Sequence, residues 1–178
     1  MANVLIVPGR GNSGPDHWQT HLQASLPGCL RVDQEAWDEP ELESWARQVD
    51  RVARQAKTPP VAVAHSFGCL ALVRAILAHG TPIAASILVA PADPLRFGLA
   101  EEALRQGLGH PSEVLASTND PWLSVDKAHQ LAEAWGSEIH VLGAVGHINV
   151  ESGFGPWPEI REWALAGRVG SEALAGSK

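Results

Sequence analysis

The feature that most constrains the fold is a regular alternation of short apolar runs and helix-forming segments along the whole chain. Short, continuous apolar runs are typical of strands buried on both faces of a parallel sheet. Strands are predicted at residues 3–7, 29–34, 61–64, 84–90, 113–116 and 138–142. Helices are predicted at residues 16–26, 38–56, 69–79, 99–107, 124–135 and 158–166. This alternation predicts an α/β fold of three layers, with helices on both faces of one parallel sheet.

The length of 178 residues suits a single domain, and the composition, 45% hydrophobic and 19% charged, is that of an ordinary globular protein. No linker or internal repeat divides the chain. We expect one domain over residues 1–166. The Gly, Ser and Ala residues of 167–178 predict a flexible C-terminal tail.

Charge and hydropathy exclude several classes of partner. The formal net charge is -7 and no cluster of Lys and Arg occurs, which argues against nucleic acid. No apolar stretch approaches the roughly 18 residues of a membrane helix. The segment Asn3–Val7 is typical of a first strand rather than a signal peptide. The two cysteines, of which Cys69 is expected to be a buried thiol, fit the predicted cytoplasmic location.

The segment Val61–Gly68 marks the most informative point of the chain. It runs from an apolar strand into a helix through Ala64-His-Ser-Phe-Gly68, which approximates Gly-x-Ser-x-Gly with Ala64 in place of the first glycine. A turn of this kind exposes its central residue at the top of the sheet. Ser66 is therefore a candidate nucleophile.

Two further polar residues follow later strands, Asp120 after the fifth and His147 after the sixth. Reactive groups of a parallel sheet gather at the carboxyl ends of its strands. A serine hydroxyl needs an imidazole to take its proton, and the imidazole needs a carboxylate to hold its tautomer. The order Ser66, Asp120, His147 is that of α/β-hydrolases. We predict these residues as nucleophile, acid and base.

Competing residues exist for the acid and the base. Asp93 also follows a strand, but the turn that carries Asp120 is the usual position of the acid in this fold, so Asp93 is expected to shape the pocket instead. His65 lies beside Ser66, yet the turn points its ring away from the hydroxyl, which makes it a poor base.

The other histidines are assigned structural roles. His129 falls within a predicted helix and His140 within a predicted strand. His17 and His21 have the i, i+4 spacing of a metal pair. Because no third ligand is evident, no metal is expected.

The first loop, Gly9-Arg-Gly-Asn-Ser-Gly14, matches the dinucleotide-binding pattern G-x-G-x-x-G, with Asp33 or Glu35 at a suitable distance. Pro8 precedes the motif, and Pro15 stands where the helix of a dinucleotide site should already run. A dinucleotide-binding protein is therefore the weaker alternative, and no cofactor is predicted.

The first loop is better explained as part of an oxyanion hole, in which two backbone N–H groups stabilise the charge that develops during acyl transfer. Phe67, directly after the nucleophile, would provide one amide. Arg10 or Gly11 would provide the other, since glycines allow the backbone to approach the substrate.

Several segments of the chain together resemble a known family, the small serine hydrolases similar to retinoblastoma-binding protein 9. The matching segments are Val4-Leu-Ile-Val-Pro-Gly-Arg-Gly11, Asp16-His-Trp18, Val63-Ala-His-Ser-Phe-Gly68, Ser117-Thr-Asn-Asp-Pro121, Gly146-His-Ile-Asn149 and Gly153-Phe-Gly-Pro-Trp157. They span nearly the whole chain. The resemblance implies the same roles for Ser66, Asp120 and His147. It also implies a reduced α/β-hydrolase fold with an all-parallel six-stranded sheet in the order 2-1-3-4-5-6.

The sequence departs from the general α/β-hydrolase pattern at Ala64 and at Pro8-Gly9, where many of these enzymes have His-Gly. The second departure concerns the oxyanion donor and leaves the three predicted catalytic residues unaffected.

The predicted function is hydrolysis of a small acyl ester through an acyl-enzyme intermediate, and the partner is thus a small-molecule substrate. The chain is too short for a cap domain, so an open, shallow pocket is expected. Its candidate lining residues are Trp18, Asp93, Phe97, Trp122, Phe154 and Trp157. A non-catalytic binding protein on a hydrolase scaffold is the alternative.

Overall fold

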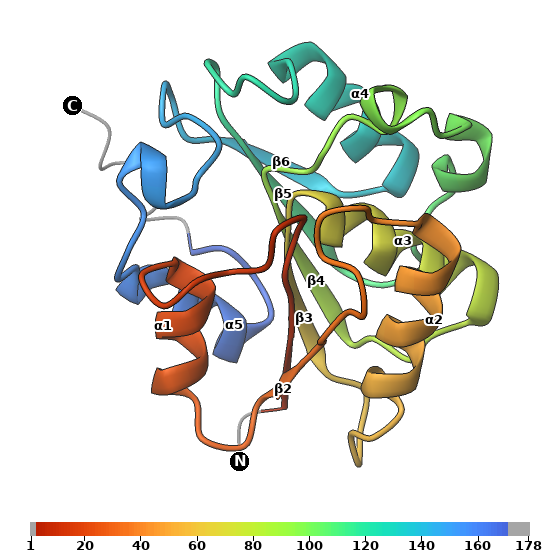
Figure 1. Ribbon diagram of the computed structural model, residues 1–178, viewed down its shortest axis with the longest axis vertical. Coiled ribbons are helices and arrows are strands. Elements are labelled where there is room, and N and C mark those ends of the chain that lie inside the picture. Colours follow the sequence, from red (N-terminus) through yellow and green to blue (C-terminus); the bar gives the residue numbers. More distant parts are fainter. Residues whose placement is uncertain (1–2, 171–178) are drawn as a thin grey trace.

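The computed structural model describes residues 3–170, which form a central sheet with helices on both faces (Figure 1). The sheet has six parallel strands in the order β2-β1-β3-β4-β5-β6. Its strands are β1 (Val4–Val7), β2 (Leu30–Arg31), β3 (Val61–His65), β4 (Ala85–Val89), β5 (Ser112–Ala116) and β6 (Glu138–Val141). The predicted fold class and strand order are confirmed.

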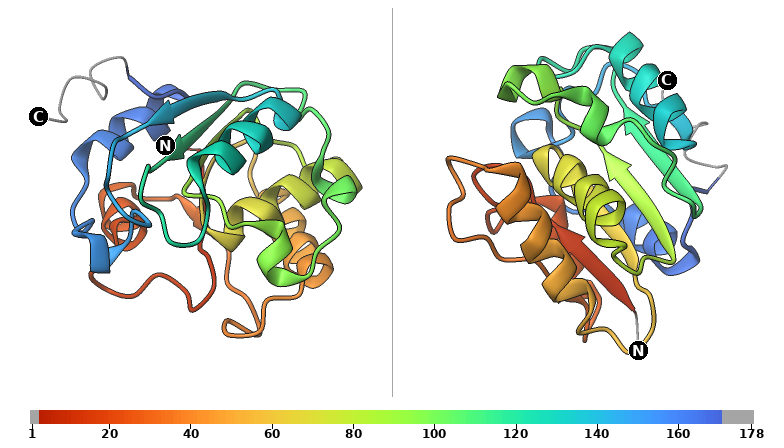
Figure 2. Two further views of the ribbon diagram at one scale, coloured as in Figure 1. Left: turned by 90° about the horizontal axis from the view of Figure 1, so that it is seen from above. Right: turned by 90° about the vertical axis from the view of Figure 1, so that its right-hand side faces the viewer.

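Five α-helices cover the described part of the sheet, three on one face and two on the other (Figures 1 and 2). The helices are α1 (Trp18–Ser25), α2 (Leu42–Ala53), α3 (Phe67–His79), α4 (Val125–Trp135) and α5 (Pro158–Ala166). Helices α2, α3 and α4 share one apolar cluster, and α1 and α5 share the other. Within β1, Leu5 faces the first cluster and Ile6 the second, as alternating strand side chains must.

Two predicted elements differ from the structure near proline and glycine residues. Helix α2 was expected to begin near Asp38, but Glu41 is its N-cap, and its carboxylate accepts the amides of Glu43 and Ser44 at 3.0 and 2.8 Å. Pro40 keeps Glu39 before it out of helical conformation, and Glu41 is itself extended, with φ -107° and ψ 120°.

The helix predicted over 99–107 is wrong. Within this range only a short 3₁₀ helix forms, η2 (Glu101–Leu104), and a second one, η1 (Pro94–Phe97), precedes it. Ala100 is extended before η2, and Arg105, with φ -99° and ψ 70°, ends it, so no continuous helix spans 99–107.

The C-terminal segment was expected to be a flexible tail from residue 167 on. In the first part of this tail, residues 167–170, Val169 is buried and its amide donates to Glu113 Oε1 at 2.8 Å. Residues 171–178 of that tail lie outside the described residues.

Among residues 3–170, no helix is both long and apolar enough to cross a membrane.

The connection between β3 and α3 depends on close backbone approach to the end of β1. A Cβ atom built on Gly68 would lie 2.6 Å from the carbonyl oxygen of Val7 and closer still to that of Pro8. A Cβ on Gly9 would lie 2.9 Å from Ser66 Cβ. Side chains at either position would push the first loop away from the β3–α3 turn, so both glycines are needed for this packing.

We predict that Gly68→Ala lowers the free energy of unfolding by about 3 kcal/mol, because the added methyl meets rigid backbone carbonyls. This loss outweighs the gain of up to about 1 kcal/mol that alanine brings to a helix. Urea denaturation of both proteins measures the difference. Gly107→Ala is the matched control, since a Cβ there meets nothing within 4 Å. Equal stabilities of the Gly68→Ala and Gly107→Ala proteins would contradict the prediction.

Candidate active site

Ser66 lies in a sharp, strained turn between β3 and α3. Its φ is 56°, in the left-handed region that side-chain-bearing residues rarely adopt. The turn is bonded to β4 and to the segment after it, because the Ser66 amide donates to Val89 O at 3.1 Å and the Ala92 amide donates to Ser66 O at 3.2 Å. These bonds hold the strained turn in place.

A chain of hydrogen bonds joins the three residues expected at the strand ends. His147 Nε2 lies 2.9 Å from Ser66 Oγ, and His147 Nδ1 lies 3.0 and 2.9 Å from the two oxygens of Asp120. Because a carboxylate only accepts, the neutral His147 carries its proton on Nδ1, which leaves Nε2 free to accept from the Ser66 hydroxyl. The arrangement can move a proton from Ser66 to His147.

Asp120 is held by its own turn. Its side chain is only 2% exposed, and the Trp122 amide donates to Asp120 Oδ1 at 2.9 Å. Asp93, the alternative acid, makes no contact of this kind with His147. Its carboxylate instead accepts the Leu95 amide at 3.0 Å and caps η1.

Ser117 and Asn119 join the loop of Asp120 to the loop of His147, a role that sequence reasoning missed. Asn119 Oδ1 accepts the Gly146 amide at 2.7 Å, and Ser117 Oγ accepts the Val145 amide at 3.0 Å. Ser117 Oγ also donates to Asn119 Oδ1 at 2.8 Å. The only sequence signal was their proximity to Asp120.

Two buried ring N–H groups hold the backbone that carries His147. His65 Nε2 lies 3.0 Å from the His147 carbonyl oxygen, and Trp18 Nε1 donates to the Ile148 carbonyl oxygen at 2.8 Å. Since a carbonyl only accepts, His65 carries its proton on Nε2. Ile148 has a φ of 51°, which a β-branched residue adopts only when its surroundings impose it. His65 thus contacts the backbone of His147 and not the Ser66 hydroxyl.

The rings of His17 and His65 are kept neutral by their surroundings. The His65 ring centroid lies 5.0 Å from those of His17 and His147. Burial, together with the nearby His147 and His17, lowers the pKa of His65 well below its usual value. Burial, followed by the charge of Arg31 and by His147, lowers the pKa of His17 to about 4.

The first loop lies beside Ser66, and its amides differ in availability. The Gly11 amide donates to the Trp37 carbonyl oxygen at 2.9 Å, and the Asn12 amide to that of Gly9 at 3.1 Å. Within residues 3–170, no hydrogen bond engages the amides of Arg10 or Phe67. Of the two first-loop candidates for the oxyanion donor, the Gly11 amide is therefore already hydrogen-bonded, and the Arg10 amide is free to donate.

The same loop does not lead into a helix as a dinucleotide site requires. Helix α1 begins only at Trp18, after Pro15, and its N-cap is His17, whose Nδ1 accepts the Gln19 amide at 3.1 Å. The glycine pattern therefore lacks the helix N-terminus that would face a pyrophosphate.

The aromatic residues expected in the pocket occupy different environments. Trp18 is fully buried, and its ring packs against Trp157 at a centroid distance of 5.5 Å. Phe154 packs against Trp157 at 4.9 Å, so these three side chains belong to the apolar layer of α1 and α5. Phe97 packs on the other face of the sheet. Trp122, by contrast, is 46% exposed, with its ring centroid 6.4 Å from that of His147.

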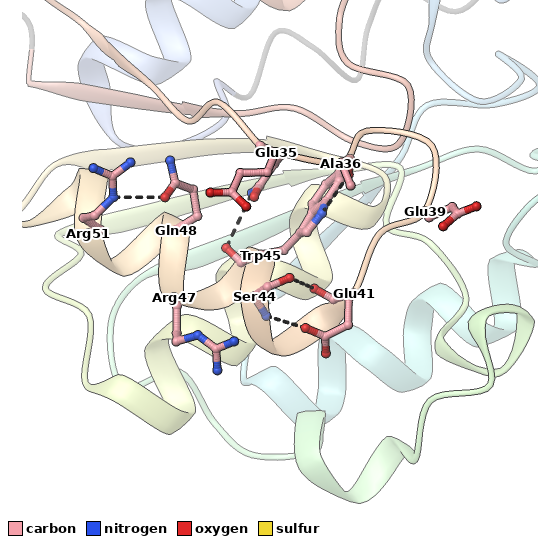
Figure 3. A pocket seen from close by; sticks show the side chains of 10 residues that line it. Glu35, Ala36, Glu39, Glu41, Ser44, Trp45, Arg47, Gln48 and Arg51 are labelled. Atoms are coloured by element: carbon pink, nitrogen blue, oxygen red, sulfur yellow. Dashed lines mark hydrogen bonds between the residues drawn. The ribbon is translucent and has the colours of Figure 1, made fainter.

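A separate hollow of about 380 Å³ lies beside α2 (Figure 3). It contains none of the predicted site residues. Acidic and basic side chains both line it, and Glu41 within it is occupied in capping α2. The lining residues are Gln34, Glu35, Ala36, Glu39, Glu41, Ser44, Trp45, Arg47, Gln48 and Arg51.

One group of possible metal-ligating atoms occurs in the described part of the chain, formed by Glu113, Glu138 and His140. It lies at the amino ends of β5 and β6, away from the edge that carries Ser66. His140 Nε2 lies 2.6 Å from Glu113 Oε2, and the other Glu113 oxygen accepts the Val169 amide. Protein partners thus already engage this carboxylate.

Comparison with known proteins gives one family and several structural relatives. A family model described as serine hydrolase matches residues 4–165. A search of curated protein sequences finds no significant match. A crystal structure from Pectobacterium atrosepticum, described as that of a YdeN-like hydrolase, shares 35% identity at a TM-score of 0.86, over 92% of this chain and 89% of that chain.

Two more distant structures show the same fold. The ydeN gene product of B. subtilis is 21% identical with a TM-score of 0.76, over 94% of this chain and 98% of that chain. Est1E of Butyrivibrio proteoclasticus, solved with ferulic acid bound, is 13% identical with a TM-score of 0.70, over 94% of this chain and 89% of that chain.

We predict that His65→Leu lowers the free energy of unfolding by about 1–3 kcal/mol, because the buried His147 carbonyl loses its donor. His65→Gln, which restores an N–H donor, should recover part of this loss. Chemical denaturation of both variants provides the measurement. His110→Leu is a control that removes another histidine hydrogen bond, the one to Ser86, away from the site. Equal stability of the Leu and Gln variants at position 65 would contradict the role of the N–H group.

We also predict that stability falls as the pH decreases from about 6.5 to about 4. A histidine with a lowered pKa in the folded state binds fewer protons there than in the unfolded state, so unfolding gains protons over this range. The slope per histidine is at most about 1.4 kcal/mol per pH unit. His17→Asn removes one titrating ring yet keeps an N-capping side chain, and it should flatten the slope. Identical slopes for the two proteins in denaturation at pH 4–7 would exclude His17 as a contributor.

Proposed function

The chain belongs to the serine hydrolase family, and we propose that it is a carboxylic ester hydrolase in which Ser66, His147 and Asp120 form a catalytic triad. One observation carries the proposal: the His147 ring is bonded on one side to Ser66 Oγ and on the other to both oxygens of Asp120. This is the geometry in which an imidazole can act as the base of a serine nucleophile.

In the first half of the reaction, Ser66 Oγ attacks the ester carbonyl carbon while His147 Nε2 takes the hydroxyl proton. The C–Oγ bond forms, and the carbonyl π electrons move to its oxygen. Asp120 stabilises the imidazolium that results. When the tetrahedral intermediate collapses, the bond to the leaving oxygen breaks and His147 returns the proton to that oxygen, which releases an alcohol.

In the second half, water replaces the alcohol. His147 takes a proton from the water as its oxygen attacks the acyl-enzyme carbonyl. Collapse of the second intermediate breaks the bond to Ser66 Oγ, which regains its proton from His147, and a carboxylic acid leaves. The cycle uses only protons already present, so the proposed reaction requires no cofactor.

The amides of Phe67 and Arg10 are the proposed oxyanion donors. Both are free of hydrogen bonds in the described structure, and the first loop lies against the Ser66 turn through Gly9. Preformed backbone donors stabilise the developing negative charge without reorganisation. Gly11 is the weaker choice because Trp37 already accepts from its amide.

The proposed substrate is a small acyl ester. The segment between β4 and β5 holds only the short helices η1 and η2, which supports a site without a covering domain. The narrower resemblance to the family of retinoblastoma-binding protein 9 and the cytoplasmic location stay predictions.

We expect Ser66→Ala to abolish cleavage of short-chain nitrophenyl esters, a loss of at least about 10³-fold, with little change in Tm. A fluorophosphonate probe should label Ser66 in the wild-type protein. Asp120→Asn should slow labelling by about 10⁴-fold because His147 loses the carboxylate that holds its tautomer.

Asp93→Asn is the matched control for this experiment, since asparagine can also cap η1. It should be labelled at the wild-type rate. Full activity of Ser66→Ala would overturn the mechanism. A well-folded wild-type protein that is never labelled would favour a non-catalytic binding protein instead.

A further inference from the structure

Most of the exposed large apolar side chains follow the carboxyl ends of strands, as the residues of the proposed triad do. Four large hydrophobic residues are exposed in the described part of the chain: Leu95, Trp122, Val150 and Leu165. The first three lie in the segments that follow β4, β5 and β6, respectively, and only Leu165 lies elsewhere, on α5. Exposed apolar side chains that cluster at one place mark binding surfaces more often than scattered ones do.

Trp122 is the member of this group closest to the triad. Its amide donates to Asp120 Oδ1 at 2.9 Å, which fixes its backbone relative to the acid. Its ring centroid lies 6.4 Å from that of His147. Arg96 Cζ lies over the same ring, 5.6 Å from its centroid, a cation–π contact that helps to hold the ring in place. An ordered yet 46% exposed indole thus stands beside the proposed base.

The proposed mechanism determines which part of an ester would meet this indole. His147 Nε2 must come within hydrogen-bond reach of the leaving oxygen in order to protonate it. The carbonyl oxygen points instead to the amides of Phe67 and Arg10. The alcohol portion of the ester therefore extends from the His147 side of the site, where Trp122 lies.

We propose that Trp122 binds the alcohol portion of the substrate and gives the enzyme a preference for esters of bulky apolar alcohols. This inference rests on the proposed function. A planar aromatic or branched aliphatic group would cover the exposed indole and remove apolar surface from water. The acyl portion, which leaves the carbonyl carbon in another direction, would not contact Trp122.

Three esters separate the two sides of the substrate: methyl acetate, benzyl acetate and methyl phenylacetate. The benzyl ring stands on the alcohol side in the second ester and on the acyl side in the third. Their kcat/KM values can be measured by titration of the released acid. The wild-type protein should prefer benzyl acetate to methyl acetate.

Trp122→Ala should lower the benzyl-to-methyl ratio of kcat/KM about tenfold, which is the effect of losing part of one apolar contact. The ratio of methyl phenylacetate to methyl acetate should stay within about twofold. Trp122→Phe should retain most of the preference. Leu165→Ala, which shortens an equally exposed apolar side chain on α5, should change neither ratio.

Fluorophosphonate labelling distinguishes failure of this inference from failure of the proposed function. If Ser66 is labelled but Trp122→Ala leaves the benzyl-to-methyl ratio unchanged, or changes only the acyl-side ratio, the inference is overturned while the triad stands. A dimer that dissociates in Trp122→Ala, measured by light scattering, would also overturn it by identifying the surface as an interface between copies of the chain.

Discussion

Close backbone packing between the end of β1 and the β3–α3 turn is the constraint on which the site depends. Gly68 lies under the carbonyl groups of Val7 and Pro8, and Gly9 lies against Ser66. This contact brings the first loop and the turn together, and in both segments an amide, that of Arg10 and that of Phe67, is free of hydrogen bonds in the described structure. The positive φ of Ser66 costs on the order of 1–3 kcal/mol, and it persists because the central strands and a buried helix hold both sides of the turn.

The loop that carries His147 is fixed by residues distant in the sequence. Trp18 comes from α1 and His65 from the end of β3, next to Ser66, and their ring N–H groups donate to two consecutive carbonyl oxygens. Asn119 adds a bond from the Asp120 loop to the Gly146 amide. Hydrogen bonds to three other segments therefore hold this loop in place. The backbone that carries the His147 ring is thereby fixed, as the proposed role of base requires.

Much of the fold could be predicted from the chain because hydrophobic alternation is a local signal. All six strands occur where apolar runs predict them, and α4 forms within the predicted range 124–135, capped by Ser124 and Gly136. The errors fall where backbone conformation overrides side-chain pattern. Helix α2 begins only after Pro40 and the extended Glu41, and the expected helix over 99–107 is reduced to η2, between the non-helical Ala100 and Arg105.

The sequence by itself determined the sheet, the alternation of layers and the candidates Ser66, Asp120 and His147. Parallel topology sends every strand end to one edge, so chain order alone places these residues together. Only the tertiary structure decided that the Gly11 amide donates to the Trp37 carbonyl oxygen and that the His65 ring bonds to the carbonyl oxygen of His147. Such contacts join residues far apart in the chain, and their partners depend on how loops pack in space, which no local pattern encodes.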